Sequence, residues 1–294
     1  MKVGFIGLGK MGNGCCGNLI TKNHEVTVYD LLPQAAEKYK GKAAIASSPE
    51  ELFRAVDVTF LSLPGYPEVE AMTERFLAVG VKDKAVIDLS TSYPPSCKTI
   101  QAKFKAAGGV FLDAPLTGTP VMAAEGTLVV NVGGDEADYQ KYKDVIAAFS
   151  KASHYIGPAG AGNVAKLMNN FLAIMYTALY SECFPLAEKM GYDIKRLFEI
   201  ISDSGVNCPI YQRAVPKMCI NKTFDPGFSV NFCIKDLSYL KKLFDEYKCP
   251  TLVLDGGLNA FKLTSAMGYG EEDSSNVGKL TYRNLGIKLD SENR

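Results

Sequence analysis

The chain has 294 residues, of which 47% are apolar and 22% are charged, and its 32 basic residues balance its 32 acidic ones. That length allows two domains. A net charge of zero without a run of like charge argues against nucleic acid or an anionic membrane as a main partner. The sequence passes from Met1 directly into a strand-like stretch, and its longest apolar run, 171–180, is too short to span a bilayer. We therefore expect a cytoplasmic protein.

The cysteine and histidine content argues against a metal site. Eight cysteines occur without a Cys-x-x-Cys pair, and His24 and His154 are the only histidines. A structural zinc site needs four such ligands at short spacings, so no metal is expected. In a cytosolic chain the thiols are expected to be reduced and buried as small apolar groups.

The first half of the chain alternates between strand and helix patterns. Strands are expected at 3–7, 25–30, 58–63, 85–90, 110–115, 127–132 and 154–157, and helices at 10–22, 34–40, 49–55, 67–78, 95–107 and 136–149. Alternating βα units imply a mostly parallel sheet with helices on both faces. We therefore expect a doubly wound α/β domain over residues 1–162.

The second half contains no strand-like run. A single helix of more than twenty residues is expected over 164–190, ended by Gly191 in the left-handed conformation. Further helices are expected at 194–202, 212–220, 230–247, 251–267 and 275–285. Residues 163–294 are therefore expected to form an all-helical domain that opens with an interdomain helix, 163–191.

A dinucleotide-binding fingerprint lies between the first strand and the first helix. It consists of Gly7, Leu8, Gly9, Lys10, Met11 and Gly12, all of which we expect to contact the cofactor. The first glycine allows the tight turn, the second lets the backbone approach the pyrophosphate, and the third lets helix and strand pack closely. The helix N-terminus adds unpaired N–H groups for the phosphates. The motif predicts a Rossmann-type nucleotide domain.

Asp30 ends the second expected strand, 18 residues after Gly12. A carboxylate at that place can accept hydrogen bonds from both ribose hydroxyls and would repel a 2′-phosphate. Leu31 and Leu32 follow it and supply no arginine for such a phosphate. NAD is therefore expected and NADP is disfavoured. The alternative is that Asp30 only caps the helix after Pro33.

Two further strand ends are expected near the ligands, because open parallel sheets bind ligands at the carboxyl ends of their strands. Leu63 ends the third expected strand and Pro64 follows it, and Thr91 and Ser92 follow the fourth. We expect Leu63, Pro64 and Thr91 to contact the cofactor. Ser92 is expected to contact the substrate.

Lys166 lies within an otherwise mostly apolar helix and is the expected general acid/base. A dehydrogenase needs a group that exchanges a proton with the substrate hydroxyl, and histidines are scarce here. A free lysine titrates near ~10.4, so it must be desolvated or lie near another cation, such as Lys235, to exchange protons usefully. The alternatives are that Lys166 reaches solvent and that Lys235 forms an exposed ion pair with Asp236.

Asn170 shares a helix face with Lys166, because residues four apart on a helix lie on the same side. It is expected to bind a substrate hydroxyl or carboxylate. Asn169 is more readily explained as a core residue that caps or bridges helices.

A loop of small donors follows the strand at 110–115. Thr117, Gly118 and Thr119 there can hold a carboxylate through N–H and hydroxyl groups. The alternative is a plain turn that ends the strand.

Together these motifs resemble those of the β-hydroxyacid dehydrogenase family, which includes 3-hydroxyisobutyrate dehydrogenases. The resemblance covers nearly the whole chain and rests on residues 4–12, 113–119 with 126–128, 157–170, and Lys235-Asp236-Leu237. It implies that Lys166 is the general acid/base, that Asn170 orients the substrate, and that Lys235 helps to complete the site. It also implies a helical domain used for oligomerisation, as a homodimer or homotetramer.

The substrate loop departs from the family pattern. The family has Ser-Gly-Gly where this chain has Thr117, Gly118 and Thr119, and the two threonines add bulk beside the expected carboxylate site. The hypothesis is an NAD-dependent enzyme that interconverts a short β-hydroxy carboxylate and its semialdehyde. The alternatives are a reductase of glyoxylate and succinic semialdehyde, of tartronate semialdehyde, or of a sulfonated or phosphorylated aldehyde, and a dinucleotide-binding scaffold without turnover.

Overall fold

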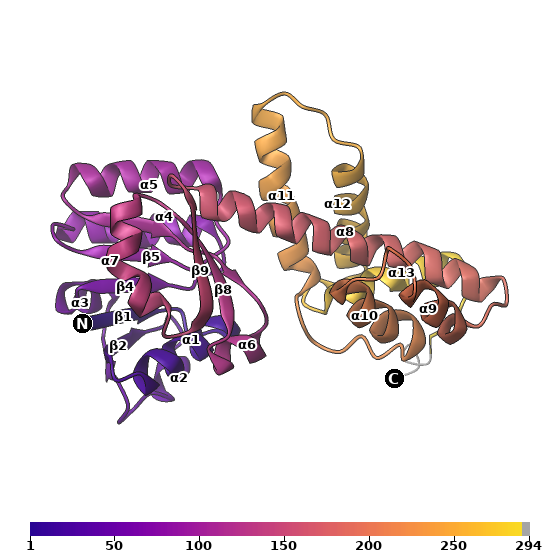
Figure 1. Cartoon of the computed structure of the whole chain (residues 1–294), viewed down its shortest axis with the longest axis horizontal. Coiled ribbons are helices and arrows are strands. Elements are labelled where there is room, and N and C mark those ends of the chain that lie inside the picture. The colour runs from indigo at the N-terminus through magenta and orange to yellow at the C-terminus, as the bar shows by residue number, and fades with distance from the viewer. Residues whose placement is uncertain (290–294) are drawn as a thin grey trace. The chain divides into compact units, whose positions relative to one another are not determined.

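The computed structural model describes residues 1–289 and divides the chain into two compact units, Met1–Lys166 and Leu167–Arg294. The expected boundary at 162–163 therefore falls just inside the first unit. Figure 1 shows that the first unit is a sheet with helices on both sides and that the second unit is built of helices. This architecture confirms the expected fold class: a doubly wound α/β domain, a long helix and an all-helical domain.

The first unit contains one nine-stranded sheet. Its strands are β1 (Lys2–Ile6), β2 (Glu25–Tyr29), β3 (Ala44–Ile45), β4 (Val58–Leu61), β5 (Ala85–Asp88), β6 (Val110–Asp113), β7 (Leu116–Thr117), β8 (Leu128–Gly133) and β9 (Ser150–Gly157). The first six are parallel, in the order β3-β2-β1-β4-β5-β6. This is the strand order of dinucleotide-binding sheets, in which the order reverses between β1 and β4.

Helices cover both faces of this sheet. They are α1 (Lys10–Thr21), α2 (Pro33–Glu37), α3 (Pro49–Ala55), α4 (Tyr66–Val79), α5 (Pro94–Ala106), α6 (Pro120–Glu125) and α7 (Glu136–Ile146). Successive strand residues point to opposite faces, so Phe60 belongs to the core under α1, α2, α6 and α7, whereas Leu61 belongs to the core under α3, α4 and α5. The continuous apolar strands are therefore explained by burial on both faces.

The far edge of the sheet differs from the expectation. β8 pairs antiparallel with β6 and β7, and only β9 returns to a parallel pairing with β8. The short elements β3, β7 and α6 were not expected, because two-residue strands leave no periodic pattern. Helix α6 did carry local signals: Thr119 as N-cap, Pro120 in the first turn and Gly126 in the left-handed conformation at its end.

The second unit is helical throughout its described part. Its elements are most of α8 (Ala161–Lys189), then α9 (Ile194–Ser202), α10 (Pro209–Val215), a π-helical turn (Pro216–Ile220), α11 (Val230–Glu246), α12 (Val253–Thr264), a second π-helical turn (Ser265–Tyr269), a 3₁₀ turn (Ser274–Asn276) and α13 (Val277–Asn284). One core lies between α8, α11 and α12, and a second lies between α8, α9, α10 and α13.

Helix α8 ends at Lys189, and Gly191 follows in the predicted left-handed conformation, with a φ of +86° that is readily adopted only by glycine. Among the helices of residues 1–289, none combines the length and apolar character needed to cross a bilayer. The cysteines do not all follow the expectation of burial, because Cys183 and Cys249 are exposed.

Candidate active site

The glycine loop joins β1 to α1 in the geometry of a nucleotide-binding turn. Gly7 has a φ of +94°, and a Cβ there would lie 2.2 Å from Ser62 O. A Cβ on Gly12 would lie 2.0 Å from Gly7 O, which shows how closely helix and strand approach. The protein's own backbone therefore excludes a side chain at these two positions.

Gly9 is different, because nothing in the protein excludes a side chain there. Its φ is −68°, which any residue adopts, and no described atom lies within 4 Å of an added Cβ. The space beside Gly9 lies at the N-terminus of α1, whose N–H groups favour an anion. The loop therefore fits a dinucleotide pyrophosphate, with Leu8, Lys10 and Met11 in the same turn.

This difference between the glycines makes a testable prediction. Gly9→Ala is expected to weaken NADH binding about tenfold or more, equivalent to ~1.4 kcal/mol. The free energy of unfolding should change by less than about 1 kcal/mol, the scale of an N-cap substitution. Gly12→Ala is the matched control and should lower stability instead. Nucleotide fluorescence and urea unfolding measure the two effects, and unchanged NADH affinity in Gly9→Ala would place the pyrophosphate elsewhere.

Asp30 lies beside this loop at the end of β2. Its Oδ2 accepts a hydrogen bond from Leu8 N at 2.6 Å and its Oδ1 accepts one from Leu32 N at 2.8 Å. Leu32, without a capping side-chain bond, is the N-cap residue of α2, so the alternative that Asp30 caps this helix is not what the structure shows. The Asp30 carboxylate is thus held at the edge of the glycine loop, where a ribose would follow the pyrophosphate.

A hydrogen bond joins the segments that follow β4 and β5, at the carboxyl ends of the parallel strands. Leu63 N donates to Ser90 Oγ at 2.9 Å, which holds the segment Leu63–Pro64 against the loop that carries Thr91. Ser92 is 1% exposed, and its hydroxyl donates to Asp88 Oδ2 at 2.7 Å. Ser92 is therefore buried beneath the surface at the carboxyl ends of the strands, and its hydroxyl is bonded to Asp88.

Two buried carboxylates, Asp88 and Asp113, lie at the ends of neighbouring strands. Asp88 also accepts from Ser90 N, whereas Asp113 Oδ1 accepts from Gly160 N at 2.6 Å and Asp113 Oδ2 from Asn163 N at 2.9 Å. Burial raises the pKa of Asp88 to about 6, although its hydrogen bonds oppose this. Burial likewise raises the pKa of Asp113, again against its hydrogen bonds. The carboxylate of Asp113 fixes the N-terminus of α8 to the sheet.

Helix α8 carries Lys166 and Asn170 one turn apart. Lys166 lies in the second turn after the anchored N-terminus and is partly buried. Asn170 is 8% exposed. Asn169 is exposed rather than in the core, and its Nδ2 donates to Asn170 Oδ1 at 3.3 Å.

Within the helical unit, Asn170 is oriented by a buried acid on α11. Asn170 Nδ2 donates to Asp236 Oδ2 at 2.6 Å, and Lys235 Nζ lies 3.2 Å from Asp236 Oδ1. Asp236 is only 2% exposed, so the alternative of an exposed Lys235–Asp236 pair is wrong. Lys235 Nζ also lies 5.2 Å from the ring centre of Tyr239. Because Asp236 binds the amide nitrogen, the oxygen of Asn170, which accepts from Asn169, is the atom with a lone pair left for another donor.

The expected substrate loop, 117–119, leads into α6. Thr117 Oγ1 is buried and, within the part of the chain that the structure describes, has no hydrogen-bond partner. Gly118 has a φ of +142°, which favours glycine. Thr119 Oγ1 accepts from Met122 N at 3.3 Å as the N-cap of α6. Thr117 is thus the residue whose hydroxyl most needs a partner, since a buried unsatisfied polar group is unfavourable.

Sequence reasoning missed Asp88, Asn163 and Asp236 as parts of this arrangement. Asp88 closes β5 two residues before Ser90, a position that signals a role at the carboxyl ends of the strands. Asn163 and Asp236 lie in segments that carry the family resemblance, but their bonding partners are distant in sequence and were not predicted.

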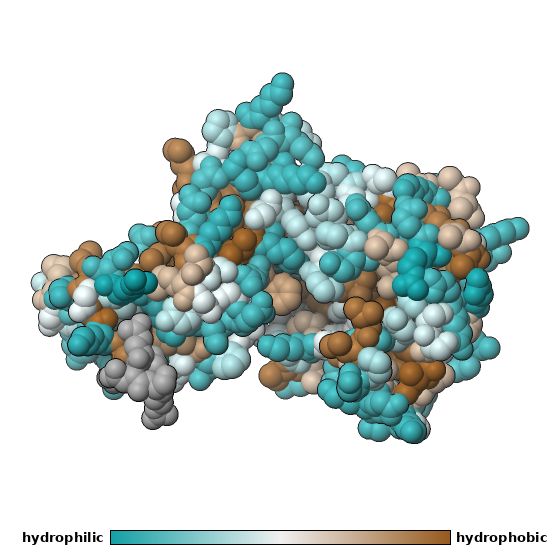
Figure 2. All heavy atoms as spheres, turned by 180° about the vertical axis from the view of Figure 1, so that it is seen from behind, coloured by the Kyte–Doolittle hydropathy of each residue, from teal (hydrophilic) through white to brown (hydrophobic). Residues whose placement is uncertain are grey.

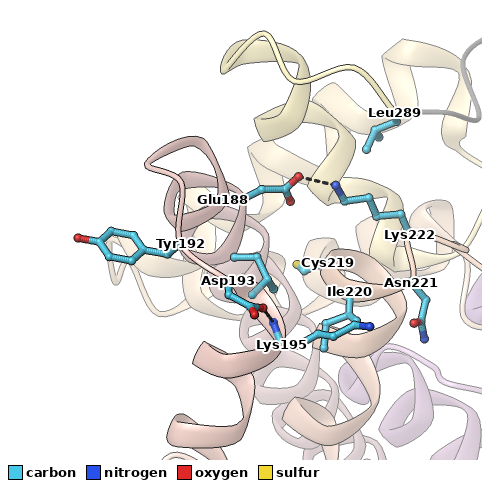
Figure 3. A pocket seen from close by; sticks show the side chains of 10 residues that line it. Glu188, Tyr192, Asp193, Lys195, Cys219, Ile220, Asn221, Lys222 and Leu289 are labelled. Atoms are coloured by element: carbon cyan, nitrogen blue, oxygen red, sulfur yellow. Dashed lines mark hydrogen bonds and ion pairs between the residues drawn. The ribbon is translucent and has the colours of Figure 1, made fainter.

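A separate hollow of about 450 Å³ lies at the other end of α8 (Figure 3). Its walls include Glu188 and Lys222, which are joined at 2.5 Å, with Cys219 behind them. Glu188 is 18 residues beyond Asn170 on one helix, so the two lie about 27 Å apart at 1.5 Å per residue. This hollow is therefore not part of the Asn170–Asp236 arrangement.

Two family models together match almost the whole chain. Residues 2–157 match the model described as the NAD binding domain of 6-phosphogluconate dehydrogenase, and residues 160–281 match that described as NAD-binding of NADP-dependent 3-hydroxyisobutyrate dehydrogenase. The chain is 32% identical over 284 residues to mitochondrial 3-hydroxyisobutyrate dehydrogenase of Drosophila melanogaster, covering 94% of this chain and 87% of that protein. It is 31% identical over 241 residues to 2-hydroxy-3-oxopropionate reductase of Escherichia coli strain K12, covering 81% and 82%.

Solved structures agree with these matches. The Mycobacterium tuberculosis 3-hydroxyisobutyrate dehydrogenase with L-serine has a TM-score of 0.88 at 28% identity, covering 95% of this chain and 98% of that chain. The fold and the glycine loop define an NAD(P)-dependent oxidoreductase of the Rossmann class. The chain belongs to the β-hydroxyacid dehydrogenase family, whose members here act as dehydrogenases or reductases of hydroxy acids.

Proposed function

We propose that this enzyme uses NAD to interconvert a short β-hydroxy carboxylate, of the 3-hydroxyisobutyrate kind, and its semialdehyde, with Lys166 as general acid/base. The observation that carries the proposal is the anchoring of α8. Asp113 binds the first turn of this helix at the carboxyl edge of the sheet, so Lys166 emerges close to that edge. An amine fixed there can take a proton from a substrate hydroxyl during oxidation and return it during reduction.

The cofactor's position follows from the glycine loop. When bound, NAD supplies the carbon that takes up the hydride from the substrate. Residues 7–12 hold its pyrophosphate, Asp30 binds the ribose hydroxyls, and Leu63, Pro64 and Thr91 line the edge beside it. Lys235 contributes from the helical unit. The Asp30 carboxylate supports NAD over NADP, because a 2′-phosphate would bring like charges together.

The substrate's carboxylate is assigned to the loop at 117–119. The unpartnered hydroxyl of Thr117 donates to it, with the backbone N–H groups of Gly118 and Thr119. The oxygen of Asn170, directed by Asp236, accepts from the substrate's hydroxyl or holds the adjacent carbon in place. Ser92 supports this edge from behind.

A substrate panel tests the function. We expect NAD-dependent oxidation of 3-hydroxyisobutyrate or a close homologue, with a higher kcat/KM for NAD than for NADP. The panel run in reverse with NADH separates glyoxylate, succinic semialdehyde, tartronate semialdehyde, and sulfonated or phosphorylated aldehydes. NADH binding without turnover on any of them would favour a scaffold over an enzyme.

We also propose that the chain forms a homodimer or homotetramer through an apolar stripe on α8. The stripe consists of residues spaced three, four or seven apart, with the last just beyond the end of α8, each at least 40% exposed: Met168, Leu172, Tyr176, Leu179, Leu186 and Met190. Figure 2 shows that hydrophobic residues reach the surface among hydrophilic ones on one face of the molecule. Such a contiguous patch favours a second copy as its partner. Light scattering should give the mass of two or four chains, and a single-chain mass would contradict this.

A further inference from the structure

Asn163 is the central residue of a buried network, and its side chain has no role in the cofactor and substrate assignments. Its side chain is 0% exposed. Its Oδ1 accepts from Ser92 N at 2.7 Å, and its Nδ2 donates to Asp113 Oδ2 at 3.3 Å. One side chain thus joins the loop after β5, the end of β6 and the first turn of α8.

The chemistry of this position requires both a donor and an acceptor. Ser92 N needs an acceptor, whereas the Asp113 carboxylate needs a donor. A primary amide provides both on a short side chain, and an ionised carboxylate or an apolar group does not. The network therefore fixes the distance between the Ser92 loop and α8 through one amide.

Lys166 follows Asn163 on the same helix. Residues three apart share a helix face, and the first turn is closed by the bond from Val164 N to Gly160 O at 2.9 Å. A shift of Asn163 relative to the loop would therefore carry the backbone of Lys166 with it.

We infer that Asn163 is a positioning residue for the hydroxyl–aldehyde chemistry. It holds the first turn of α8 in register with the Ser92 loop, so that the amine of Lys166 stands at a fixed place beside the edge where Thr91 contacts the cofactor. This inference rests on the proposed function, in which Lys166 exchanges the proton.

The groups around Asn163 suggest a sharp test. Two titratable side chains contact Asn163 Nδ2: Asp113 at the end of β6, and Cys97 on α5, whose Sγ lies 3.5 Å away. A third, Asp88 at the end of β5, binds the hydroxyl of Ser92, whose backbone N–H donates to Asn163. Asn163→Asp places a third carboxyl group among them. Ionised, it repels Asp113; protonated, it can again donate to Asp113 while accepting from Ser92 N.

We expect Asn163→Asp to lose kcat at neutral pH and to regain it as the pH is lowered. With the best substrate of the panel, in the direction of reduction, kcat of Asn163→Asp should fall about 10- to 100-fold at neutral pH, the scale of a small misplacement of a catalytic group. The ratio to wild type should recover as the pH is lowered. Asn163→Ala should stay low at every pH. The melting temperature of Asn163→Asp should follow the same pH trend, whereas its NADH dissociation constant should match that of wild type.

Asn276→Asp is the matched control. Asn276 is also buried, and its Nδ2 donates to Asp273 O in the helical unit. Asn276→Asp should have a lower melting temperature than wild type, and its kcat at temperatures below the unfolding transition should be unchanged. Should Asn163→Asp fold too poorly to assay, Asn163→Ser keeps a hydroxyl too short for both bonds and should lower kcat with KM unchanged.

Two results would overturn the inference: a kcat of Asn163→Asp equal to that of wild type at neutral pH, or a reduced kcat that does not recover as the pH is lowered. In the Asn163→Ser assay, kcat equal to that of wild type would do the same. Lys166→Met separates this from failure of the proposed function. If Lys166→Met abolishes turnover while Asn163→Asp does not, Lys166 is catalytic without help from Asn163. If Lys166→Met retains turnover, the proposed function itself fails.

Discussion

Lys166→Met is expected to lower kcat by about two to four orders of magnitude, the range that removal of a general acid/base produces. Methionine keeps most of the length and apolar stem of lysine, so the packing of α8 should persist. NADH binding should be retained, because residues 7–12 and Asp30 lie on other elements. Steady-state kinetics and nucleotide fluorescence measure the two properties; the chain has no tryptophan to complicate the second.

Lys189 provides a matched control for this prediction. It lies in the last turn of α8 and is exposed, so Lys189→Met changes the same side chain on the same helix without touching the site. Its kcat should equal that of wild type. Equal kcat values for Lys166→Met and Lys189→Met would remove Lys166 from the chemistry.

Asp113→Asn is expected to be the most destabilising of the conservative changes. Both oxygens of Asp113 accept from N–H donors: Gly160 N on one side, and Asn163 N and Nδ2 on the other. The NH₂ group of an asparagine would point at the N–H donors on one of these two sides. Buried donors would then face each other without an acceptor. The free energy of unfolding should fall by about 2–4 kcal/mol, the scale for unsatisfied buried groups and bonds to a charged acceptor.

Asp88→Asn is the contrasting control for Asp113→Asn. One partner of Asp88 is the hydroxyl of Ser92, which can turn to accept from the new amide. At pH 7 the free energy of unfolding should be unchanged or higher than that of wild type. A loss in Asp88→Asn as large as that in Asp113→Asn would contradict this account of the two carboxylates.

The pH dependence of stability separates the two carboxylates further. The pKa of Asp88 rises from 3.8 to about 6 on burial, so folding takes up a proton between these values. The resulting stability is complete below pH 3.8 and is lost as the pH rises through 6. The advantage of Asp88→Asn over wild type should therefore shrink between pH 7 and pH 4, by up to about 3 kcal/mol. Urea unfolding followed by circular dichroism measures it; an advantage that does not vary with pH would contradict the raised pKa.

Much of the fold could be predicted because its signals are local. Strands buried on both faces, such as β4, are continuous apolar runs, and prolines mark the first turns of α3, α4 and α5. The glycine loop was visible for the same reason: its three glycines act within one turn. The antiparallel edge was missed because β7 is only two residues long.

The supporting part of the site could not be predicted, since it depends on contacts between distant residues. Ser92 and Asn163 are 71 positions apart, and Asn170 and Asp236 are 66 apart. No periodicity or motif spacing reports such a pair. The two threonines of the expected substrate loop were visible in the sequence, but only the structure shows that Thr119 caps α6 while the hydroxyl of Thr117 has no partner among residues 1–289.

Exchange of the substrate's proton by the amine of Lys166 should be visible in the pH dependence of kcat/KM for oxidation, compared between wild type and Lys166→Met. Wild type is expected to show a rising limb set by one ionisation, and the residual activity of Lys166→Met is expected to lack this limb. An unchanged limb in Lys166→Met would show that another group takes the proton.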